Sequence, residues 1–322
     1  MSKRPVRGLI SIAFILFSAL LVAQNLVAQN DAPPPGPQGQ GQRPFAPSSD
    51  RPALYGGRAE ARRPGKKNVL VWADVRNGFQ HDSISHAIAT IERLGYESGL
   101  YDTFLRTDSQ LITKHGVFGT DGQKVYGHDL NDFDVIFFFG VREIDLTAQQ
   151  RADLLAFIHD DGKGFVAAHS ANTSFMAWPE FGEMIGGRFD GHPWGVIEGP
   201  VVLEDPAFPA TKHFPAVFKW RDEMYQTKDL SRDKVRVLLR LDVSKFDMTK
   251  TGVHRTDGDF PLAWVKTYGK GRVFYSALGH DITSWDDPGI QKMYFEAIKW
   301  ALGMSEGDIT PRPRQSGNAS GR

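Results

Sequence analysis

Short apolar runs alternate with helical patterns in the first half of the region that is expected to fold. The runs lie at residues 68–73, 133–140 and 162–168. They are rich in β-branched and aromatic residues, as in strands buried on both faces. Apolar residues recur at helical spacing over 84–94, and Gly95 is expected to end that helix. Thr147 and Gln150 form a capping box for a second helix. This order predicts a doubly wound, mainly parallel α/β sheet.

The second half of the same region turns toward β structure. Further strands are predicted at residues 196–203, 235–241, 261–266 and 272–276. The stretch 268–271, Tyr-Gly-Lys-Gly, suits a tight hairpin between the last two. An apolar stripe after Pro288 predicts a closing helix. We therefore expect an added antiparallel edge on the parallel sheet.

Both ends of the chain differ in composition from this region. Residues 1–28 place three basic residues before an apolar run that ends in small residues, which is typical of a secretory signal peptide. Residues 29–67 and 304–322 are poor in apolar residues, and we expect a disordered Pro/Gly-rich linker and a disordered tail. Residues 68–303 then form one domain of an exported protein, periplasmic or secreted, with no stable membrane span after signal cleavage.

Charge and cysteine content exclude several classes of partner and chemistry. The 322 residues carry 38 Lys and Arg against 38 Asp and Glu, so no global positive field is available to attract nucleic acid. Cysteine is absent, which excludes disulfides, a thiol nucleophile and any cysteine-ligated metal. The glycine-rich stretches do not match a dinucleotide or phosphate-binding motif.

The candidate functional residues lie mainly beyond the ends of the predicted strands. Ligands of open α/β sheets bind beyond the carboxyl ends of the strands. Three histidines lie beyond the ends of three predicted strands: His81, His169 and His280. Ser170, Asn172 and Asp281 in the same segments are candidates for contact with a substrate. His192 and Trp194, from a glycine-rich bend that could reach the same rim, are further candidates. A single histidine near a strand end is more often structural, but several at one rim favour a shared site.

The residue types leave two uses open. Neutral imidazoles bind transition metals, and one imidazole can act as a general base near neutral pH. The chain lacks HExxH, so a divalent metal stays an open alternative. Asp222 and Glu223 are adjacent, and on a strand they point to opposite faces, so at most one serves the site. Ser170 lacks the flanking glycines of a nucleophile elbow.

Taken together, these motifs resemble the trehalose-utilisation (ThuA-like) family. The matching stretches cover the whole domain: NVLVWADVRNGFQHDS, FDVIFFFG, GKGFVAAHSAN, WPEFGEMIGGRFDGHPW, RDEMYQ and PLAWVKTYGKGRVFYSALGHDITSW. The resemblance implies a flavodoxin-like, class I glutamine amidotransferase-like fold. It also implies a link to sugar catabolism, including trehalose and 3-keto sugars. Where the amidotransferases carry a catalytic cysteine, this chain has His169 and Ser170, so glutamine hydrolysis through a thiol is excluded.

These observations lead to one hypothesis and two alternatives. We expect a carbohydrate-processing enzyme, a hydrolase or lyase that acts on a glycoside or a 3-keto sugar and holds no nucleic acid. His169 is the expected base, and the expected catalytic set is His169, His81, His280 and Glu223. The alternatives are a non-catalytic sugar-binding module and a metal-dependent hydrolase. The sequence leaves the sugar, the linkage and the oligomeric state open.

Overall fold

The computed structural model describes residues 66–76, 78–119, 121–123 and 127–314. These described residues belong to one compact unit. The expected signal peptide, the expected linker up to residue 65 and residues 315–322 lie outside the described part. Within that part, no helix has both the length and the apolar character that a membrane crossing needs.

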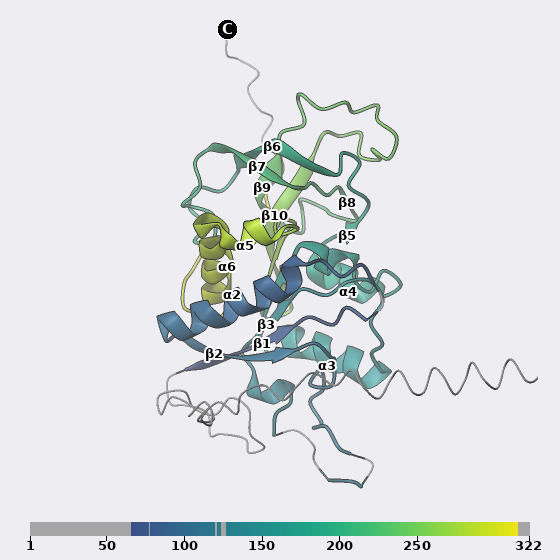
Figure 1. Ribbon diagram of the computed structural model, residues 1–322, viewed down its shortest axis with the longest axis vertical. Helices are drawn as coiled ribbons and strands as arrows, with labels where there is room; N and C mark the ends of the chain where they lie inside the picture. Colours follow the sequence, from purple (N-terminus) through teal and green to yellow (C-terminus); the bar gives the residue numbers. More distant parts are fainter. Residues whose placement is uncertain (1–65, 77, 120, 124–126, 315–322) are drawn as a thin grey trace, which may run out of the picture. The chain divides into compact units, whose positions relative to one another are not determined.

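One large sheet organises the described residues (Figure 1). Its strand order is β2-β1-β3-β4-β11-β10-β9-β6-β7. The strands are β1 (Lys67–Trp72), β2 (Tyr101–Arg106), β3 (Val135–Phe138), β4 (Gly164–Ala168), β6 (Val196–Leu203), β7 (Val217–Glu223), β9 (Arg236–Leu241), β10 (Phe260–Tyr268) and β11 (Gly271–Ser276). From β2 to β11 the neighbours are parallel, in the order typical of flavodoxin-like folds. From β11 to β7 they are antiparallel. The predicted parallel sheet with an antiparallel edge is confirmed.

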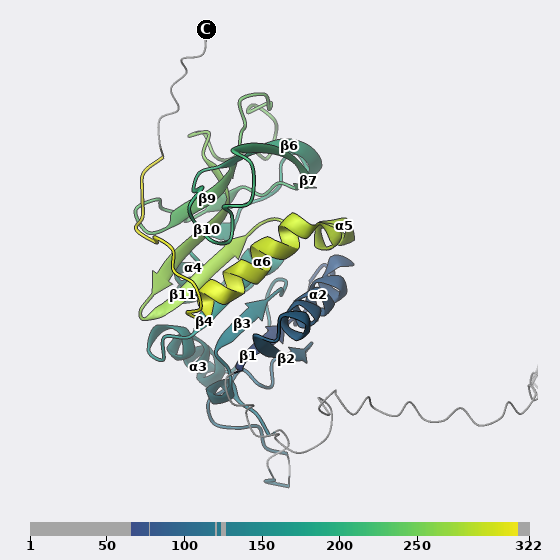
Figure 2. The ribbon, with the colours of Figure 1, turned by 90° about the vertical axis from the view of Figure 1, so that its left-hand side faces the viewer.

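Helices cover both faces of the parallel part. They are α2 (Ser83–Ser98), α3 (Ala148–His159), α4 (Pro179–Ile185), α5 (Ile282–Asp286) and α6 (Pro288–Ala301). α2 and α6 lie on one face, and α3 and α4 lie on the other (Figure 2). β1, β3 and β4 are therefore buried along almost their whole length, and their only polar residues are Lys67 and Asn68 at the start of β1. A small separate sheet pairs β5 (Arg188–Phe189) with β8 (Thr227–Lys228).

The end of α2 corrects one prediction. We expected Gly95 to stop this helix, but the helix continues to Ser98 and ends at Gly99, which has a left-handed φ of 68°. Gly95 has a packing role instead, because a Cβ at this position would lie 2.4 Å from the ring of Tyr101. Glycine is therefore needed here for a close approach between α2 and β2.

The segment after α6 forms no helix or strand in its described part, residues 304–314. Several of its polar groups contact the domain. Arg236 donates to Asp308 at 2.6 Å, Arg272 pairs with Glu306, and Arg314 donates to the carbonyl of Asp257. These contacts hold the segment along the surface as far as residue 314.

Candidate functional site: a histidine and glutamate cluster

The corner after β4 presents His169 in an unusual backbone conformation. β4 ends at Ala168, and His169 opens the short 3-10 helix η2 (His169–Thr173) with φ 44°. A non-glycine residue in this region costs on the order of 1–2 kcal/mol. The strain is held by specific bonds: Tyr275 donates to the carbonyl of His169, and His169 Nδ1 lies 2.6 Å from the carbonyl of Ala277. Because a carbonyl only accepts, Nδ1 carries a proton, and in the neutral imidazole Nε2 holds the lone pair.

Four side chains from distant segments meet at this corner. His81 comes from the loop after β1, His169 follows β4, His280 follows β11, and Glu223 ends β7. The centroids of the three imidazole rings lie 4.9 to 5.1 Å from one another. One nitrogen or oxygen atom from each of the four residues lies within 4.8 Å of all the others. We call these four residues the His/Glu cluster. The meeting of the three histidines at one rim follows the rule for strand ends.

Contacts within the cluster and burial shift the pKa values of three of its members. Burial, followed by the charges of His169 and His280, lowers the pKa of His81 to about 3, so its imidazole is neutral. Burial alone would raise the pKa of Glu223, but the imidazoles of His169 and His280 outweigh it and lower the pKa well below its usual value. The hydrogen bond to Glu223 raises the pKa of His280 against the effect of burial. Glu223 is therefore a carboxylate at neutral pH.

Two further residues touch the cluster. Tyr225 is buried, and its hydroxyl lies 2.8 Å from His169 Nε2, to which it can donate. His192 Nε2 lies 3.3 Å from Glu223 Oε1, and 45% of the His192 side chain is exposed. Glu223 thus contacts imidazoles through both carboxylate oxygens, one inside the cluster and one toward solvent.

Asp222 positions the two members that neighbour it. It is fully buried, and it accepts hydrogen bonds from the backbone nitrogens of Gly279 and His280 at 2.9 and 3.1 Å. Trp220 Nε1 and Ser284 Oγ donate to the same carboxylate. Asp222 therefore ties the end of β7 to the loop after β11, which sets Glu223 beside His280. The two adjacent carboxylates do face different surroundings, as the strand period predicts.

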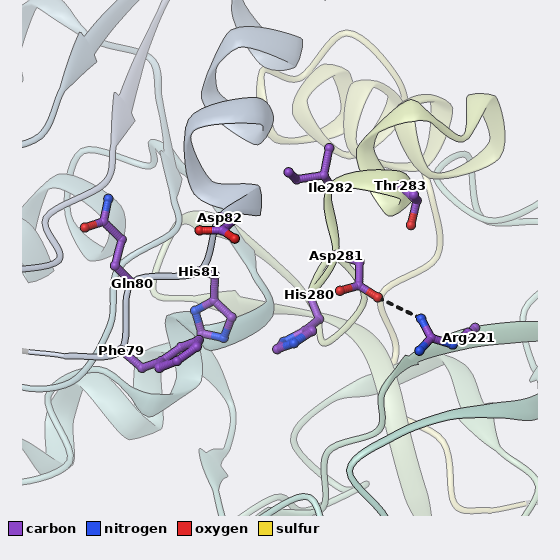
Figure 3. A pocket seen from close by; sticks show the side chains of 9 residues that line it. All are labelled: Phe79, Gln80, His81, Asp82, Arg221, His280, Asp281, Ile282 and Thr283. Atoms are coloured by element: carbon purple, nitrogen blue, oxygen red, sulfur yellow. Dashed lines mark hydrogen bonds and ion pairs between the residues drawn. The ribbon is translucent and has the colours of Figure 1, made fainter.

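A pocket of about 360 Å³ lies beside the cluster (Figure 3). His81 and His280 form part of its wall. The other lining residues are Phe79, Gln80, Asp82, Arg221, Asp281, Ile282 and Thr283. Arg221 and Asp281 form an ion pair of 3.1 Å in the wall, and the exposed ring of Phe79 packs edge-on against His81 (Figure 3). The cluster is thus reached from a space that combines apolar and charged groups.

A family model described as ThuA, trehalose utilisation, matches residues 68–301. The chain belongs to the ThuA family. A comparison with curated protein sequences finds no significant match.

Solved ThuA-like structures share the fold of this ThuA protein. A ThuA-like protein from Bacteroides uniformis ATCC 8492 is 21% identical with a TM-score of 0.59, over 76% of this chain and 95% of that chain. A ThuA-like protein from Parabacteroides merdae ATCC 43184 is 16% identical with a TM-score of 0.53, over 77% of this chain and 93% of that chain. These similarities confirm the class I glutamine amidotransferase-like fold that the sequence motifs imply.

The ThuA fold places the remaining candidates around the cluster rather than in it. Ser170 is buried, and its hydroxyl donates to the carbonyl of Gly140 at 3.1 Å. Asn172 is 1% exposed, and its amide atoms have no hydrogen-bond partner among the described residues. Trp194 donates to the carbonyl of Asp247 and packs on Phe246, so its contacts lie outside the cluster. Asp281 lines the pocket.

Sequence reasoning did not assign roles to Tyr225 and Asp222. A signal for Tyr225 was present, because residues two apart on an extended segment share a face, and Tyr225 follows Glu223 at that spacing. Asp222 carries no such signal, because its partners are backbone nitrogens from a loop that is distant in sequence. The carbonyl of Ala277, which fixes the tautomer of His169, is likewise invisible in the sequence.

Proposed function

We propose that this ThuA protein is a carbohydrate-processing enzyme that acts on a glycoside oxidised to a ketone at C3. The observation that carries the proposal is that two members of the His/Glu cluster, His81 and His280, line a pocket of about 360 Å³, within the range typical of small-molecule sites. Membership of a family described by trehalose utilisation supports a sugar as the substrate.

The proposed reaction is an elimination across C1 and C2 of the oxidised sugar. The C3 ketone makes the hydrogen on C2 acidic. A base takes that proton, the electrons of the C2–H bond form the C1–C2 double bond, and the C1–O bond breaks. The glycosidic oxygen leaves with those electrons and takes up a proton. The products are the released alcohol and an unsaturated 3-keto sugar. The negative charge that develops on the C3 oxygen needs positive charge or hydrogen-bond donors nearby.

We assign the role of base to His192. The sequence favoured His169, but this residue is fully buried and its Nε2 is enclosed by Tyr225, His280 and Glu223. His192 is half-exposed and is oriented through Nε2 by Glu223. Because Nε2 is directed at Glu223, Nδ1 is the ring nitrogen left to take a proton from the substrate.

The experiment compares oxidised and ordinary glycosides as substrates. Purified protein is incubated with 3-keto-trehalose, p-nitrophenyl 3-keto-glucoside and the parent glycosides, with and without added Zn²⁺ or Mn²⁺. We expect release of the leaving group and an ultraviolet-absorbing enone only from the keto forms. Deuterium at C2 is expected to slow the reaction, because that bond breaks. His192→Asn is expected to lose at least 100-fold in kcat.

The matched control is His254→Ala, which changes another exposed histidine that pairs with an aspartate. Its turnover is expected to equal that of the original protein. Saturable binding of the keto sugars without product would instead support a sugar-binding module and overturn the enzyme proposal. Product formation with full retention of the C2 hydrogen would exclude elimination.

A further inference from the structure

We propose that the His/Glu cluster binds one divalent first-row transition metal ion through His81, His169, His280 and Glu223. These four residues are arranged as a ligand set whether or not the substrate is a sugar. Such an ion gives the cluster a specific cofactor class, which the sequence left open.

The distances between donor atoms match a coordination sphere. His169 Nε2 lies 3.1 Å from His280 Nδ1, and Glu223 Oε2 lies 3.6 Å from the His169 nitrogen and 3.3 Å from the His280 nitrogen. Zinc–nitrogen and zinc–oxygen bonds of about 2.1 Å in a tetrahedral site place neighbouring donors about 3.4 Å apart. Three of the four donors are therefore already separated as ligands of one ion, and His81 completes the group within 4.8 Å.

The hydrogen bonds also fit a ligand set. His169 donates its Nδ1 proton to the carbonyl of Ala277, which is the usual outer contact of a metal-binding histidine, and its Nε2 lone pair faces the cluster. His81 is 7% exposed, and its Nδ1 has no hydrogen-bond partner among the described residues. Buried polar atoms without partners are rare in folded proteins, and a cation would satisfy the crowded lone pairs.

The donor types select the class of ion. Three imidazole nitrogens and one carboxylate oxygen suit Zn²⁺, Mn²⁺, Fe²⁺, Co²⁺ and Ni²⁺. Mg²⁺ and Ca²⁺ prefer oxygen ligands and are expected to bind far more weakly. Because His81 and His280 also line the pocket, a molecule in the pocket can approach the ion. If the proposed function holds, the ion supplies the positive charge for the C3 oxygen and His192 stays outside the ligand set as the base.

The experiment titrates the full-length protein, purified without a histidine tag and freed of metal by a chelator, with Co²⁺. We expect visible d–d absorption bands that saturate at one ion per chain, displacement of Co²⁺ by Zn²⁺, and no displacement by Mg²⁺. Glu223→Gln and His81→Gln keep the side-chain volume roughly constant and are expected to weaken binding at least tenfold. His159→Ala is the control, because this exposed histidine pairs only with Asp160 among the described acidic residues. The Co²⁺ affinity of this variant should equal that of the original protein.

Circular dichroism and thermal unfolding of each metal-free variant check that it folds. The original protein alone can overturn the proposal: absence of saturable Co²⁺ bands, or binding that Mg²⁺ displaces as well as Zn²⁺, contradicts it. Folded Glu223→Gln and His81→Gln proteins with undiminished affinity also contradict it. Stoichiometric metal binding without turnover of any keto sugar would leave this inference standing while the proposed function fails.

Discussion

At the scale of single residues, the site depends on backbone groups as much as on side chains. His169 occupies a left-handed conformation that only a few non-glycine residues adopt, and the carbonyl of Ala277 sets its tautomer. Gly279, with φ 131°, allows the chain to turn just before His280, where a Cβ would lie 3.1 Å from Trp285. Fixed backbone positions therefore orient two of the three imidazoles before any ligand is present.

Asp222 provides a prediction at this scale. Asp222→Asn keeps the size of the side chain but replaces one acceptor oxygen with a donor, which leaves buried N–H and O–H groups without their bonds. We expect the free energy of unfolding to fall by about 1–3 kcal/mol. Affinity for Co²⁺ is expected to fall about tenfold or more, because His280 loses its support. Urea unfolding and the Co²⁺ titration measure the two effects.

Asp281→Asn is the matched control for this substitution. Asp281 lies in the same loop, but its ion pair with Arg221 is largely exposed, so the change in stability should stay within about 1 kcal/mol. Equal stability of the Asp222→Asn protein and the original protein would show that the carboxylate does not hold the loop.

At the scale of helices and strands, local patterns predicted the elements better than their ends. The apolar runs became β1, β3 and β4, and the Thr147 capping box begins α3 as expected. The capping glycine of α2 was misassigned because Gly95 and Gly99 both fit a helix end in the sequence. Only the contact between Gly95 and Tyr101, which lies on the next strand, distinguishes them. Tertiary contacts thus decide between local signals of equal strength.

Gly95 gives the prediction for this scale. Gly95→Ala adds a methyl group where the Tyr101 ring lies 2.4 Å away, so α2 must shift from β2. We expect a loss of about 1–3 kcal/mol in the free energy of unfolding, although alanine is the better helix former. Ala89→Ser, which slightly enlarges an exposed side chain of the same helix, should change stability by no more than about 0.5 kcal/mol. Thermal unfolding of both variants measures these changes in stability. A Gly95→Ala protein more stable than the original would contradict the proposed packing role of Gly95.

At the scale of the whole molecule, topology brings the site together. The rule that ligands bind beyond the ends of parallel strands sufficed to predict the meeting of His81, His169 and His280. The contribution of β7 was less predictable, because this strand is the last in the order and the sequence does not specify how β9, β6 and β7 pair. Export through a signal peptide remains a prediction, since residues 1–28 lie outside the described part.

Acid stability is a property of the whole cooperative unit and provides a prediction at this scale. Burial alone would raise the pKa of Asp134, but hydrogen bonds from Asn68 and Lys163 outweigh it and lower the pKa. A carboxyl with a lower pKa in the folded state stabilises the protein above its unfolded pKa, and this contribution is lost as pH falls through the folded pKa. Asp134→Asn should therefore be less stable than the original protein at pH 7.

The difference between the two proteins should narrow below about pH 5, as Asp134 becomes protonated in the unfolded chain. Urea unfolding of both proteins from pH 7 to below about pH 5 tests whether the stability difference narrows as the pH falls. Asp233→Asn, which changes an exposed aspartate, serves as the reference. A difference in stability that stays constant down to acid pH would contradict the assignment.

The position of β11 has a consequence for biogenesis. This strand lies between β4 and β10 in the sheet, although it is the last strand in the chain. The central gap in the sheet cannot close until residues 271–276 have left the ribosome, and His280 emerges after them. A metal ion that needs all four residues of the His/Glu cluster as ligands can bind only after synthesis of the domain is nearly complete. A metal-loaded cluster therefore identifies a fully synthesised domain.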